Sequence, residues 1–456
     1  MTTLALCQLA GGPGAADPGT PFLARLMGLV GLATMVGIAW LLSSDRARIP
    51  WRLVGVGVAL QGALGLIVLK TGVGRALFHG ANLVFTRLLG FTEQGARFIF
   101  GNLVRNNVPV GAPGGTPADM APVGDPTLWA ATGAYFAFSV LPTIIFFSAL
   151  MSVLYYLGIM QRVVQGMAWV FQRLLGTSGA ETLSATGNIF VGQTEAPLLI
   201  KPFVGAMTVS ELNTVMVGGF ATIAGGVMAA YVGMLSPYFP DIAGHLLTAS
   251  VMNAPAGLLI SKILVPEVGV PVTRGKVKVE IAKTEANVIE AAAAGAGQGL
   301  QLALNVAAML LAFIALIALI NAVLIWGGGL AGVEGLTLER LLGWALAPLA
   351  WLMGVPWADA GTVGSLIGVK VSVNEFVAYL QLAGIMNGEG LGLRAEIIAT
   401  YALLGFANFS SIAIQIGGIG GLAPERRGDL ARLGLKAMIG GNLAAFMSAS
   451  LAGMLL

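Results

Sequence analysis

Charged side chains are scarce in this sequence. Asp, Glu, Lys and Arg make up 10% of its 456 residues, against about 25% in soluble globular domains. One cysteine, Cys7, excludes an internal disulfide and a thiolate metal cluster, and two histidines leave little for zinc or haem ligation. In their place the chain has 57% hydrophobic residues and a mean hydropathy of +0.86. This composition disfavours a soluble enzyme and a disordered or fibrous protein, and it predicts an all-α polytopic membrane protein.

Eight transmembrane helices are expected, since at about 20 apolar residues per helix the length allows roughly eight to ten. The expected spans are 21–42, 53–69, 132–157, 213–235, 246–264, 300–324, 395–419 and 435–456. Two apolar stretches interrupted by polar residues, 176–204 and 358–386, are expected to form re-entrant helical hairpins. Residues 91–107 and 287–298 are predicted as helices at the membrane interface, and 336–354 as a helix that does not cross.

Basic residues determine the expected orientation. They cluster in 46–52, 274–283 and 426–436, and the positive-inside rule assigns all three loops to the cytoplasm. Both termini then lie outside, which requires an even number of crossings, and the two hairpins enter from opposite faces. The expected location is the plasma membrane, which in a bacterium is the inner membrane. Residues 1–20 form a loose N-terminal tail, because they lack the basic start and long apolar core of a secretory signal.

One layout occurs twice along the chain. The paired features are Leu-Leu-Gly at 174–176 and Leu-Met-Gly at 352–354, Glu195 and Glu375, and Gly-Phe-Ala at 219–221 and 405–407. Each half is thus predicted to hold a broken hairpin with a central Glu, and then a span with a polar break just after Gly-Phe-Ala. Matching interrupted segments in two halves indicate inverted repeats around a transporter binding site.

Glu195 and Glu375 lie inside apolar stretches, where an ionised carboxylate costs at least about 2.5 kcal/mol. Water, backbone donors, a bound cation or a polar ligand must offset this cost. The polar residues nearby in the sequence are Asn188, Gln193, Thr194, Thr222, Asn374, Asn408, Ser410 and Ser411. No Arg is among them, so the pattern favours a neutral ligand rich in hydroxyl or amide groups over an anion.

Broken helices also expose backbone carbonyls, which coordinate Na⁺ in membrane transporters. Asn188 and Thr222 add neutral side-chain oxygens that suit Na⁺. A proton-coupled carrier would need a titrating group instead, and Glu195 or Glu375 provides one. The residues alone leave both coupling ions open.

Three motifs resemble the concentrative nucleoside transporter family. They are Gly-Asn-Ile-Phe-Val-Gly-Gln-Thr-Glu-Ala-Pro at 187–197, Asn-Glu-Phe at 374–376 and Gly-Phe-Ala-Asn-Phe-Ser-Ser-Ile at 405–412. The likeness runs through nearly all of 176–456, whereas 1–130 match only in general character. It implies a homotrimeric symporter of nucleosides such as uridine with Na⁺, with no enzymatic activity, no cofactor and no nucleic-acid partner. It also implies a transport domain that moves like an elevator across a scaffold domain.

The resemblance assigns roles to individual residues. They are Gln193, Thr194 and Glu195 for the nucleobase edge, Glu375, Asn408 and Ser411 for the ribose hydroxyls, Val227 and Phe406 for packing on the nucleoside, and Asn188, the Val191 carbonyl, Thr222 and the Ile223 carbonyl for Na⁺. The Na⁺-coupled pattern has a serine where this chain has Thr222, but threonine keeps the hydroxyl oxygen. Proton-coupled members tend to lose these oxygen ligands, so the resemblance favours Na⁺.

The same resemblance divides the chain into parts. These are the tail 1–20, mainly scaffold helices with an interfacial helix at 21–175, the first half of the transport domain at 176–264, a basic loop with an interfacial and a scaffold helix at 265–355, and the second half of the transport domain at 356–456. The second half carries Lys370, an intramembrane cation to which the sequence assigns no role.

Four other functions are weighed against Na⁺ symport. H⁺-coupled nucleoside symport is the main alternative. A channel for water or ions gives no reason for matched hairpins, and an intramembrane enzyme acting on lipid-linked nucleosides would need a metal or base cluster that the sequence does not contain. A receptor-like binding protein stays open. Purine or pyrimidine preference, the number of Na⁺ and the resting conformation are not determined by the sequence.

Overall fold

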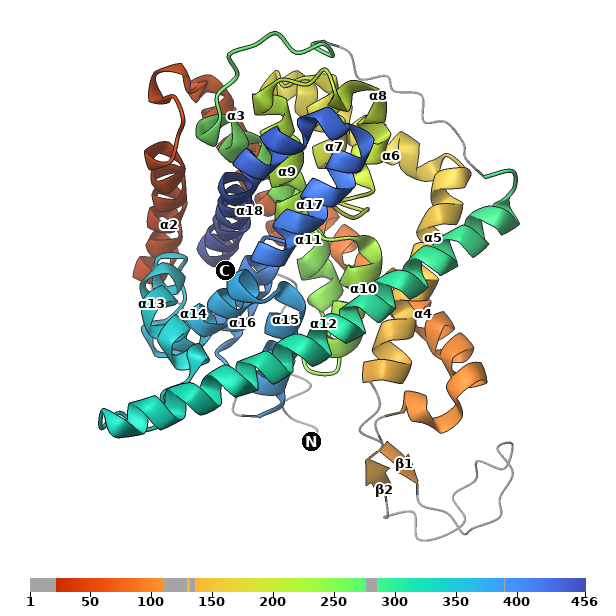
Figure 1. Cartoon of the computed structure of the whole chain (residues 1–456), viewed down its shortest axis with the longest axis vertical. Helices are drawn as coiled ribbons and strands as arrows, with labels where there is room; N and C mark the ends of the chain where they lie inside the picture. Colours follow the sequence, from red (N-terminus) through yellow and green to blue (C-terminus); the bar gives the residue numbers. More distant parts are fainter. Residues whose placement is uncertain (1–21, 106, 110–128, 132–135, 276–284, 389) are drawn as a thin grey trace.

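Figure 1 shows the computed structural model, which describes residues 22–105, 107–109, 129–131, 136–275, 285–388 and 390–456. The first part comprises α2 (Phe22–Leu41), η1 (Arg46–Arg48), α3 (Trp51–Lys70), α4 (Gly72–Phe100), η2 (Gly101–Val104), β1 (Asn107–Pro109), β2 (Trp129–Ala131), η3 (Phe136–Val140), α5 (Leu141–Tyr156) and α6 (Ile159–Leu175). The two strands pair antiparallel, with Val108 opposite Ala130, and form a small ribbon at one end of the molecule.

The middle and last parts hold the interrupted segments. The middle comprises α7 (Gly179–Gly187), η4 (Ala196–Ile200), α8 (Lys201–Val204), α9 (Val209–Ala221), α10 (Gly225–Leu235) and α11 (Ile242–Leu264). The last part comprises α12 (Val288–Leu330), α13 (Leu338–Leu352), α14 (Trp357–Ser372), α15 (Glu375–Asn387), α16 (Leu393–Leu403), α17 (Phe409–Leu422), η5 (Pro424–Arg426) and α18 (Arg427–Leu455). The described chain is thus helical apart from one ribbon, in agreement with the composition.

Six helical stretches of the described residues are long and apolar enough to cross a bilayer. They are 51–70, 136–156, 209–235, 242–264, 288–330 and 424–455, and the pair α13 and α14, bent by 117°, would make a seventh. These six fall on six of the eight expected spans. The other two expected spans coincide with α2 and with the broken pair α16 and α17, which contain shorter apolar helices. The count of eight itself remains a prediction.

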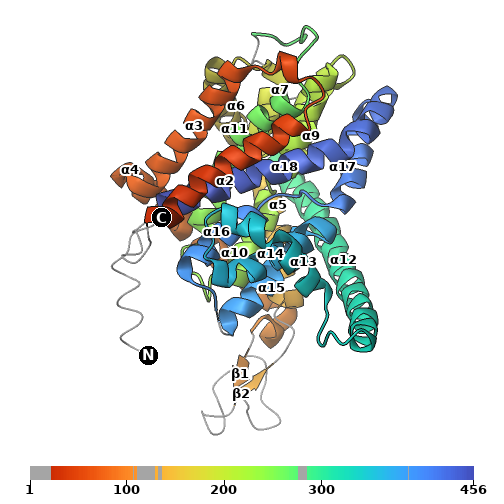
Figure 2. The same cartoon turned by 90° about the vertical axis from the view of Figure 1, so that its left-hand side faces the viewer.

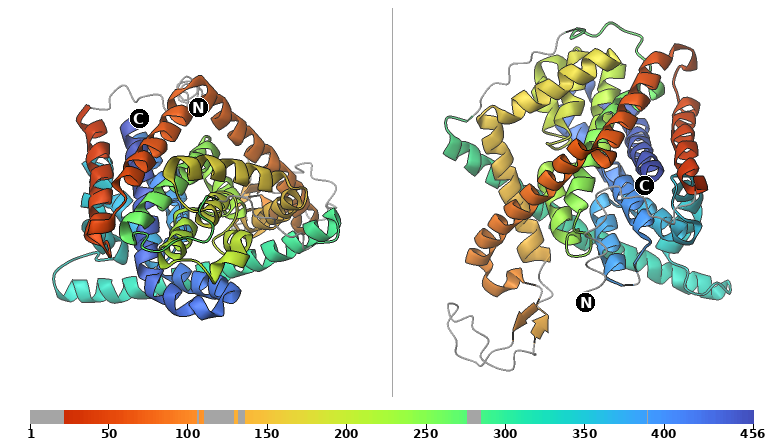
Figure 3. Two further views of the ribbon diagram at one scale, coloured as in Figure 1. Left: turned by 90° about the horizontal axis from the view of Figure 1, so that it is seen from above. Right: turned by 180° about the vertical axis from the view of Figure 1, so that it is seen from behind.

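The buried core is built by α9, α10, α11 and α18, whereas α12 lies on the outside. The membrane-length windows of 209–235, 242–264 and 424–455 are each 89% buried, but that of α12 is only 11% buried. Helix α18 contacts α2, α9, α11 and α16, and α12 packs mainly on α5. Seen from above, α12 runs along one side of the molecule and α3 with α4 along another (Figure 3).

Two predicted interfacial helices are longer in the structure. Residues 287–298 do not form a separate helix, because they continue into the following span as the 43-residue α12. At 1.5 Å per residue α12 is roughly 65 Å long, about twice the thickness of a hydrocarbon core of about 30 Å. The helix predicted at 91–107 begins at Gly72 and ends at Phe100. Exposed apolar side chains such as Phe98 and Ile99 remain on it, as an interfacial helix requires.

Both stretches predicted as hairpins are interrupted helices. In 176–204, α7 is followed by a turn and then by η4 and α8. In 358–386, only Val373 and Asn374 separate α14 from α15. Each stretch follows an amphipathic helix and a glycine with positive φ, which is Gly176 (+72°) after α6 and Gly354 (+98°) after α13. Glycine reaches this conformation without steric cost, so both chain reversals need it.

Of the two broken spans, the first agrees with the prediction and the second differs from it. The first break, 222–224, follows Gly-Phe-Ala as expected, because α9 ends at Ala221. The second break spans 404–408, so Gly-Phe-Ala at 405–407 lies inside it rather than before it. Phe220 is therefore fully buried within α9, whereas Phe406 is half-buried in the break.

The loops predicted to be cytoplasmic meet at one end of the molecule. Three contacts link them and their neighbours: Ser44 N to the Leu264 carbonyl at 2.9 Å, Thr208 Oγ1 to Glu267 Oε2 at 2.9 Å, and Arg426 Nη1 to the Met207 carbonyl at 2.6 Å. Residues 276–283 of the second basic loop lie outside the described residues. At the far end of α18, Arg25 donates to the Leu456 carbonyl at 3.2 Å, so the start of α2 lies beside the C-terminus, as the side view also shows (Figure 2).

Buried charges tie three helices together at the basic end. Glu181 and Glu211 are the acidic partners in capping boxes that begin α7 and α9. Lys262 of α11 lies 2.7 Å from Glu181 Oε2 and donates to Ser210 at 2.9 Å. Glu181, Glu211 and Lys262 are each at most 3% exposed. An unpaired charge at this depth would be costly, so the pair requires both partners.

We predict that Lys262→Met lowers the thermal stability of the detergent-solubilised protein strongly, by about 3–5 kcal/mol, because it leaves Glu181 buried without its cation. Lys262→Met combined with Glu181→Gln should recover part of the loss. Arg48→Met is the control, since the Arg48–Asp45 pair is exposed and contributes little. Equal melting of the Lys262 and Arg48 variants would contradict the prediction.

Candidate functional site

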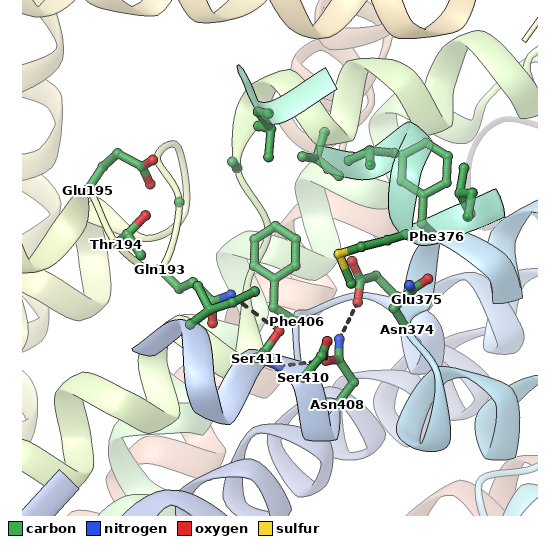
Figure 4. A pocket seen from close by; sticks show the side chains of 18 residues that line it. Gln193, Thr194, Glu195, Asn374, Glu375, Phe376, Phe406, Asn408, Ser410 and Ser411 are labelled. Atoms are coloured by element: carbon green, nitrogen blue, oxygen red, sulfur yellow. Dashed lines mark hydrogen bonds between the residues drawn. The ribbon is translucent and has the colours of Figure 1, made fainter. Parts of the chain in front are cut away.

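One cavity of about 150 Å³ receives residues from both interrupted segments, both breaks and α12 (Figure 4). Its lining comprises Gly192, Gln193, Thr194, Glu195, Ala224, Val227, Leu302, Val306, Met309, Leu310, Asn374, Glu375, Phe376, Phe406, Asn408, Ser410, Ser411 and Ile414. All eight residues predicted to contact the substrate are among them. A second cavity of about 930 Å³, between α13, α14 and α15, includes none of the predicted site residues.

Glu375 is the buried acid of the cavity. It is 4% exposed, and its carboxyl group accepts hydrogen bonds from Tyr231 Oη at 3.1 Å and from Asn408 Nδ2 at 2.9 Å. Glu375 is also the first residue of α15, where unpaired backbone N–H groups and the helix dipole favour negative charge. Asn374 caps the same helix by accepting from Val377 N at 2.9 Å. The carboxylate is therefore held on one side by the protein and faces the cavity with the other.

Asn408 and Ser411 are placed by the start of α17. Asn408 is the N-cap, and its Oδ1 accepts from Ser411 N at 2.9 Å and from Ser410 Oγ at 2.8 Å. These two bonds orient the amide so that Nδ2 donates to Glu375 (Figure 4). Ala224 and Asn374 cap α10 and α15 at the same cavity. Three helix N-termini thus converge there, and together they stabilise negative charge.

Gln193 links the first interrupted segment to α17. Its Nε2 donates to Ser411 Oγ at 3.3 Å, and its Oε1 accepts from Gln415 Nε2 at 3.0 Å. Gln415 also donates to the Met216 carbonyl of α9 at 3.1 Å. The sequence reasoning did not identify Gln415, although an amide inside an apolar helix, four residues after Ser411, is a detectable signal.

Glu195 differs from the expectation of a buried acid. It lies at the cavity wall opposite Glu375 but is exposed, and Thr194 beside it is half-buried (Figure 4). The turn that carries them is closed by Glu195 N and Ala196 N, which donate to the Gly192 carbonyl at 3.2 and 3.0 Å. This turn exposes the Glu195 carboxylate, so water can offset its charge.

The remaining wall of the cavity is apolar. Val227 is 2% exposed on α10 and Phe406 is half-buried in the second break. Leu302, Val306, Met309 and Leu310 of α12 complete this wall. The sequence did not predict the α12 residues, because an apolar side chain facing a cavity has the same sequence signature as one facing lipid.

The four residues assigned to Na⁺ lie on two segments that touch, the turn after α7 and the break after α9. Asn188, Thr222 and Ile223 are each at most 1% exposed, and Val191 is half-buried. Gly225 N donates to the Phe190 carbonyl at 2.9 Å, which joins the turn after α7 to the break after α9.

An unpartnered oxygen lies at this junction. Asn188 Nδ2 donates to the Ser184 carbonyl at 3.1 Å, but the buried Oδ1 accepts no hydrogen bond from the described residues. Thr222 Oγ1 donates to the Gly218 carbonyl at 2.9 Å, which leaves its lone pairs available. The described residues contain no group of three or more His, Cys, Asp or Glu that could hold a metal. The chemistry of the junction therefore suits a cation that prefers neutral oxygens.

Two asparagines missed by the sequence reasoning support the breaks. Asn253 of α11 donates to the Ala221 carbonyl at 2.6 Å, and Asn442 of α18 donates to the Ala407 carbonyl at 2.9 Å. Each satisfies a carbonyl that the broken helix frees, as buried backbone requires. The signal was an Asn near the middle of the apolar helix that follows each broken span.

Family models match three stretches of the chain. They are described as Na⁺ dependent nucleoside transporter N-terminus, for residues 30–103, nucleoside recognition, for 137–238, and Na⁺ dependent nucleoside transporter C-terminus, for 245–453. The chain belongs to the concentrative nucleoside transporter family. It is accordingly a multi-pass membrane protein, and the resemblance of the three motifs is confirmed.

Individual relatives agree with this family. The chain is 46% identical to the uncharacterized transporter YutK of Bacillus subtilis, over 94% of this chain and 99% of the relative. It is 40% identical to sodium/nucleoside cotransporter 1 of Mus musculus, over 94% of this chain and 64% of that longer protein. CNTnw in an inward-facing substrate-bound state superposes with a TM-score of 0.83 at 43% identity, covering 95% of this chain and 98% of CNTnw. A CNTnw variant in an outward-facing state gives a TM-score of 0.84.

We predict that Gly405→Ala disrupts the second break. Gly405 has φ +108°, and a Cβ there would lie 2.5 Å from the Phe220 carbonyl oxygen. The combined strain and overlap should lower stability by about 1–3 kcal/mol, measured as thermal unfolding in detergent. Gly417→Ala in α17 is the control, because a Cβ there meets nothing within 4 Å and alanine favours the helix. A Gly405→Ala protein as stable as Gly417→Ala would contradict this.

Proposed function

We propose that this chain is a secondary active symporter that takes up nucleosides together with Na⁺. One observation carries the proposal: both interrupted segments and both helix breaks meet at a single cavity that is polar on one side and apolar on the other. The membership of the chain in the concentrative nucleoside transporter family supports the substrate class. The protein would bind and move its substrate and would catalyse no reaction.

The chemistry of the cavity fits a nucleoside. Glu375 would accept hydrogen bonds from vicinal ribose hydroxyls, while Asn408 and Ser411 offer both donors and acceptors beside it. Gln193, with Thr194 and Glu195, would face the nucleobase edge. Val227 and Phe406 provide apolar packing for the base and the sugar. A neutral ligand is favoured because the Glu375 carboxylate already brings a negative charge to the site.

Na⁺ would bind where α7 and α9 end. The Asn188 Oδ1 and Thr222 Oγ1 atoms, with the Val191 and Ile223 carbonyls, would supply neutral oxygens. Because Asn188 lies on the first interrupted segment and Thr222 at the break, bound Na⁺ would order Gln193 for the nucleoside, and the nucleoside would then complete the site. A membrane potential of about 100 mV contributes roughly 2.3 kcal/mol per charge moved. H⁺ coupling through Glu195 or Glu375 is the alternative, and the retained oxygen ligands favour Na⁺ over it.

The architecture supports an elevator motion. The transport domain would comprise 176–264 and 356–456, with its two halves as inverted repeats and the interrupted segments as re-entrant hairpins, and eight spans in all. Helix α12 would belong to the scaffold, together with much of 21–175 and 265–355. Its wall of Leu302, Val306, Met309 and Leu310 is apolar, so a transport domain can slide past it without breaking hydrogen bonds. The exposed apolar side chains of α12 would face lipid or the partners of a homotrimer.

The membrane placement follows the basic loops. Their common end would face the cytoplasm of a bacterial cell, across its inner membrane, and the C-terminus would lie outside with the N-terminal tail. Alternating access would expose the cavity first to the outside and then to the cytoplasm.

We predict that purified protein in liposomes accumulates labelled uridine against a gradient when an inward Na⁺ gradient is imposed. A saturable, Na⁺-dependent rate is expected, and Thr222→Val should raise the Na⁺ concentration for half-maximal uptake by about tenfold, since a hydrogen-bonding oxygen is lost. Thr222→Ser, which keeps the oxygen, is the control. Equal uptake in Na⁺ and choline would remove the coupling claim, H⁺-driven uptake would establish the alternative, and unsaturable flux without accumulation would indicate a channel.

We predict that Glu375→Gln weakens uridine binding by about ten- to a hundredfold, the range for a hydrogen bond to a charged group. The loss should be specific to the sugar, so native protein should discriminate strongly against 2′-deoxyuridine and 3′-deoxyuridine, and Glu375→Gln much less. Competition against labelled uridine gives the six affinities of the two cycles, one for each deoxy analogue. Glu334→Gln, on an exposed loop, is the control. Unchanged discrimination in the Glu375 variant would remove its assigned role.

A further inference from the structure

Lys370 is a fully buried lysine to which the proposed transport cycle assigns no role. It lies on α14, is 0% exposed, and its Nζ donates to the Ala402 carbonyl at 2.9 Å and to the Leu404 carbonyl at 3.2 Å. The Phe446 ring centroid is 5.6 Å away. The ion pairs found among the described residues do not include Lys370. Its charge is therefore balanced by backbone carbonyls rather than by a carboxylate contact.

The two carbonyls belong to the end of a broken helix. Helix α16 ends at Leu403, with Leu404 as its C-cap, and 404–408 form the break before α17. The last carbonyls of a helix have no partner within it and carry the negative end of the dipole. Lys370 thus donates to the free carbonyls at the end of α16, in the way that basic side chains stabilise other helix C-termini, but it does so from a buried position.

The first half has a related arrangement without a lysine. Helix α9 ends at Ala221 with Thr222 as its C-cap, and α7 lies against it as α14 lies against α16. Leu404 and Thr222 are each the C-cap of the first helix of a broken span. Lys370 and Asn188 both lie in the first arm of an interrupted segment, Lys370 three residues before the C-cap of α14 and Asn188 as the C-cap of α7. The Asn188 Oδ1 atom accepts no hydrogen bond from the described residues.

The helices that follow strengthen this correspondence. Asn253 of α11 donates to the carbonyl of Ala221, the last residue of α9, and Asn442 of α18 donates to the carbonyl of Ala407 inside the second break. Each half therefore has an amide from the following helix at the break or at its edge. In the second half Lys370 also donates to two carbonyls there, whereas in the first half Asn188 donates to Ser184 of its own helix.

We propose that the Lys370 ammonium is a built-in cation that occupies, in the second half, the counterpart of the Na⁺ site in the first half. The inference rests on the proposed Na⁺ coupling. Under this proposal the transporter binds one Na⁺, in the first half, because the cation of the second half is part of the Lys370 side chain. Removing the ammonium while leaving room should create a second Na⁺ site, formed by the Ala402 and Leu404 carbonyls and a short oxygen-bearing side chain.

Four full-length proteins test this in proteoliposomes with labelled uridine at graded Na⁺, balanced by choline. Lys370→Ser leaves space and an oxygen, Lys370→Met fills the space without charge, and Lys370→Arg keeps the charge. The native protein and Lys370→Arg should show a Na⁺ Hill coefficient near one. Lys370→Ser should lose uptake at low Na⁺, recover at high Na⁺ and approach a Hill coefficient of about two, the number of sites. Lys370→Met should stay inactive at every Na⁺ concentration.

The outcomes distinguish the proposal of a tethered cation from the proposed Na⁺ coupling on which it rests. A native protein indifferent to Na⁺ would refute the coupling itself. A Na⁺-dependent native protein with a Lys370→Ser Hill coefficient unchanged from one, or with Lys370→Ser as inactive as Lys370→Met, would refute only the tethered cation. Thermal unfolding without nucleoside gives a second readout, because NaCl should stabilise Lys370→Ser more than choline chloride does, and Lys370→Met equally little in both. Lys370→Asn is the second oxygen-bearing variant, and failure of both it and Lys370→Ser to fold in high NaCl would also refute the proposal.

Discussion

The buried Glu375 carboxylate is the constraint on which the rest of this structure depends. A charge at this depth must be solvated by the protein, and the donors come from separate segments: Tyr231 on α10, Asn408 at the second break and the N-terminus of α15. A continuous helix could not present a helix N-terminus in the middle of the molecule. The breaks in α9–α10, α14–α15 and α16–α17 are therefore what makes a polar cavity possible inside an apolar chain.

Each break in turn frees backbone groups that need partners. Asn253 and Asn442 donate to freed carbonyls from the following helices, and Lys370 donates to two more. Gly405 lets the second break lie directly against the end of α9, where a side chain would overlap the Phe220 carbonyl. Several of the buried polar residues thus lie at the breaks, where they bond carbonyls that the broken helices free.

The sequence predicted the residues of the site better than it predicted the fold around them. Polar residues inside apolar stretches are conspicuous, and Glu375 and Asn408 stand out in this way. The resemblance of the three motifs assigned the eight substrate residues, and all eight line one cavity. The length of α12 was not predicted, because the Ala- and Gly-rich stretch before its apolar span contains no residue that marks the end of a helix. The expectation that Glu195 is a buried acid was wrong. The exposure of its side chain depends on the turn at Gly192, which the sequence did not predict. The second Gly-Phe-Ala was expected at the end of a helix but lies inside the break, because three matching residues do not determine where a helix ends.

The two halves differ in the group that lies near the end of the broken helix, which is Lys370 in the second half and Asn188 in the first. In the second half, Lys370 donates to two carbonyls at the end of α16, and under the proposal above this group never leaves. In the first half, Asn188 leaves an oxygen without a donor, so the turn carrying Gln193 is complete only when something positive arrives. If that cation is Na⁺, one wall of the nucleoside cavity is rigid and the other depends on the ion. A substrate that needs both walls then binds tightly only after Na⁺, and this order of binding follows from placing a fixed cation in one half and an exchangeable one in the other.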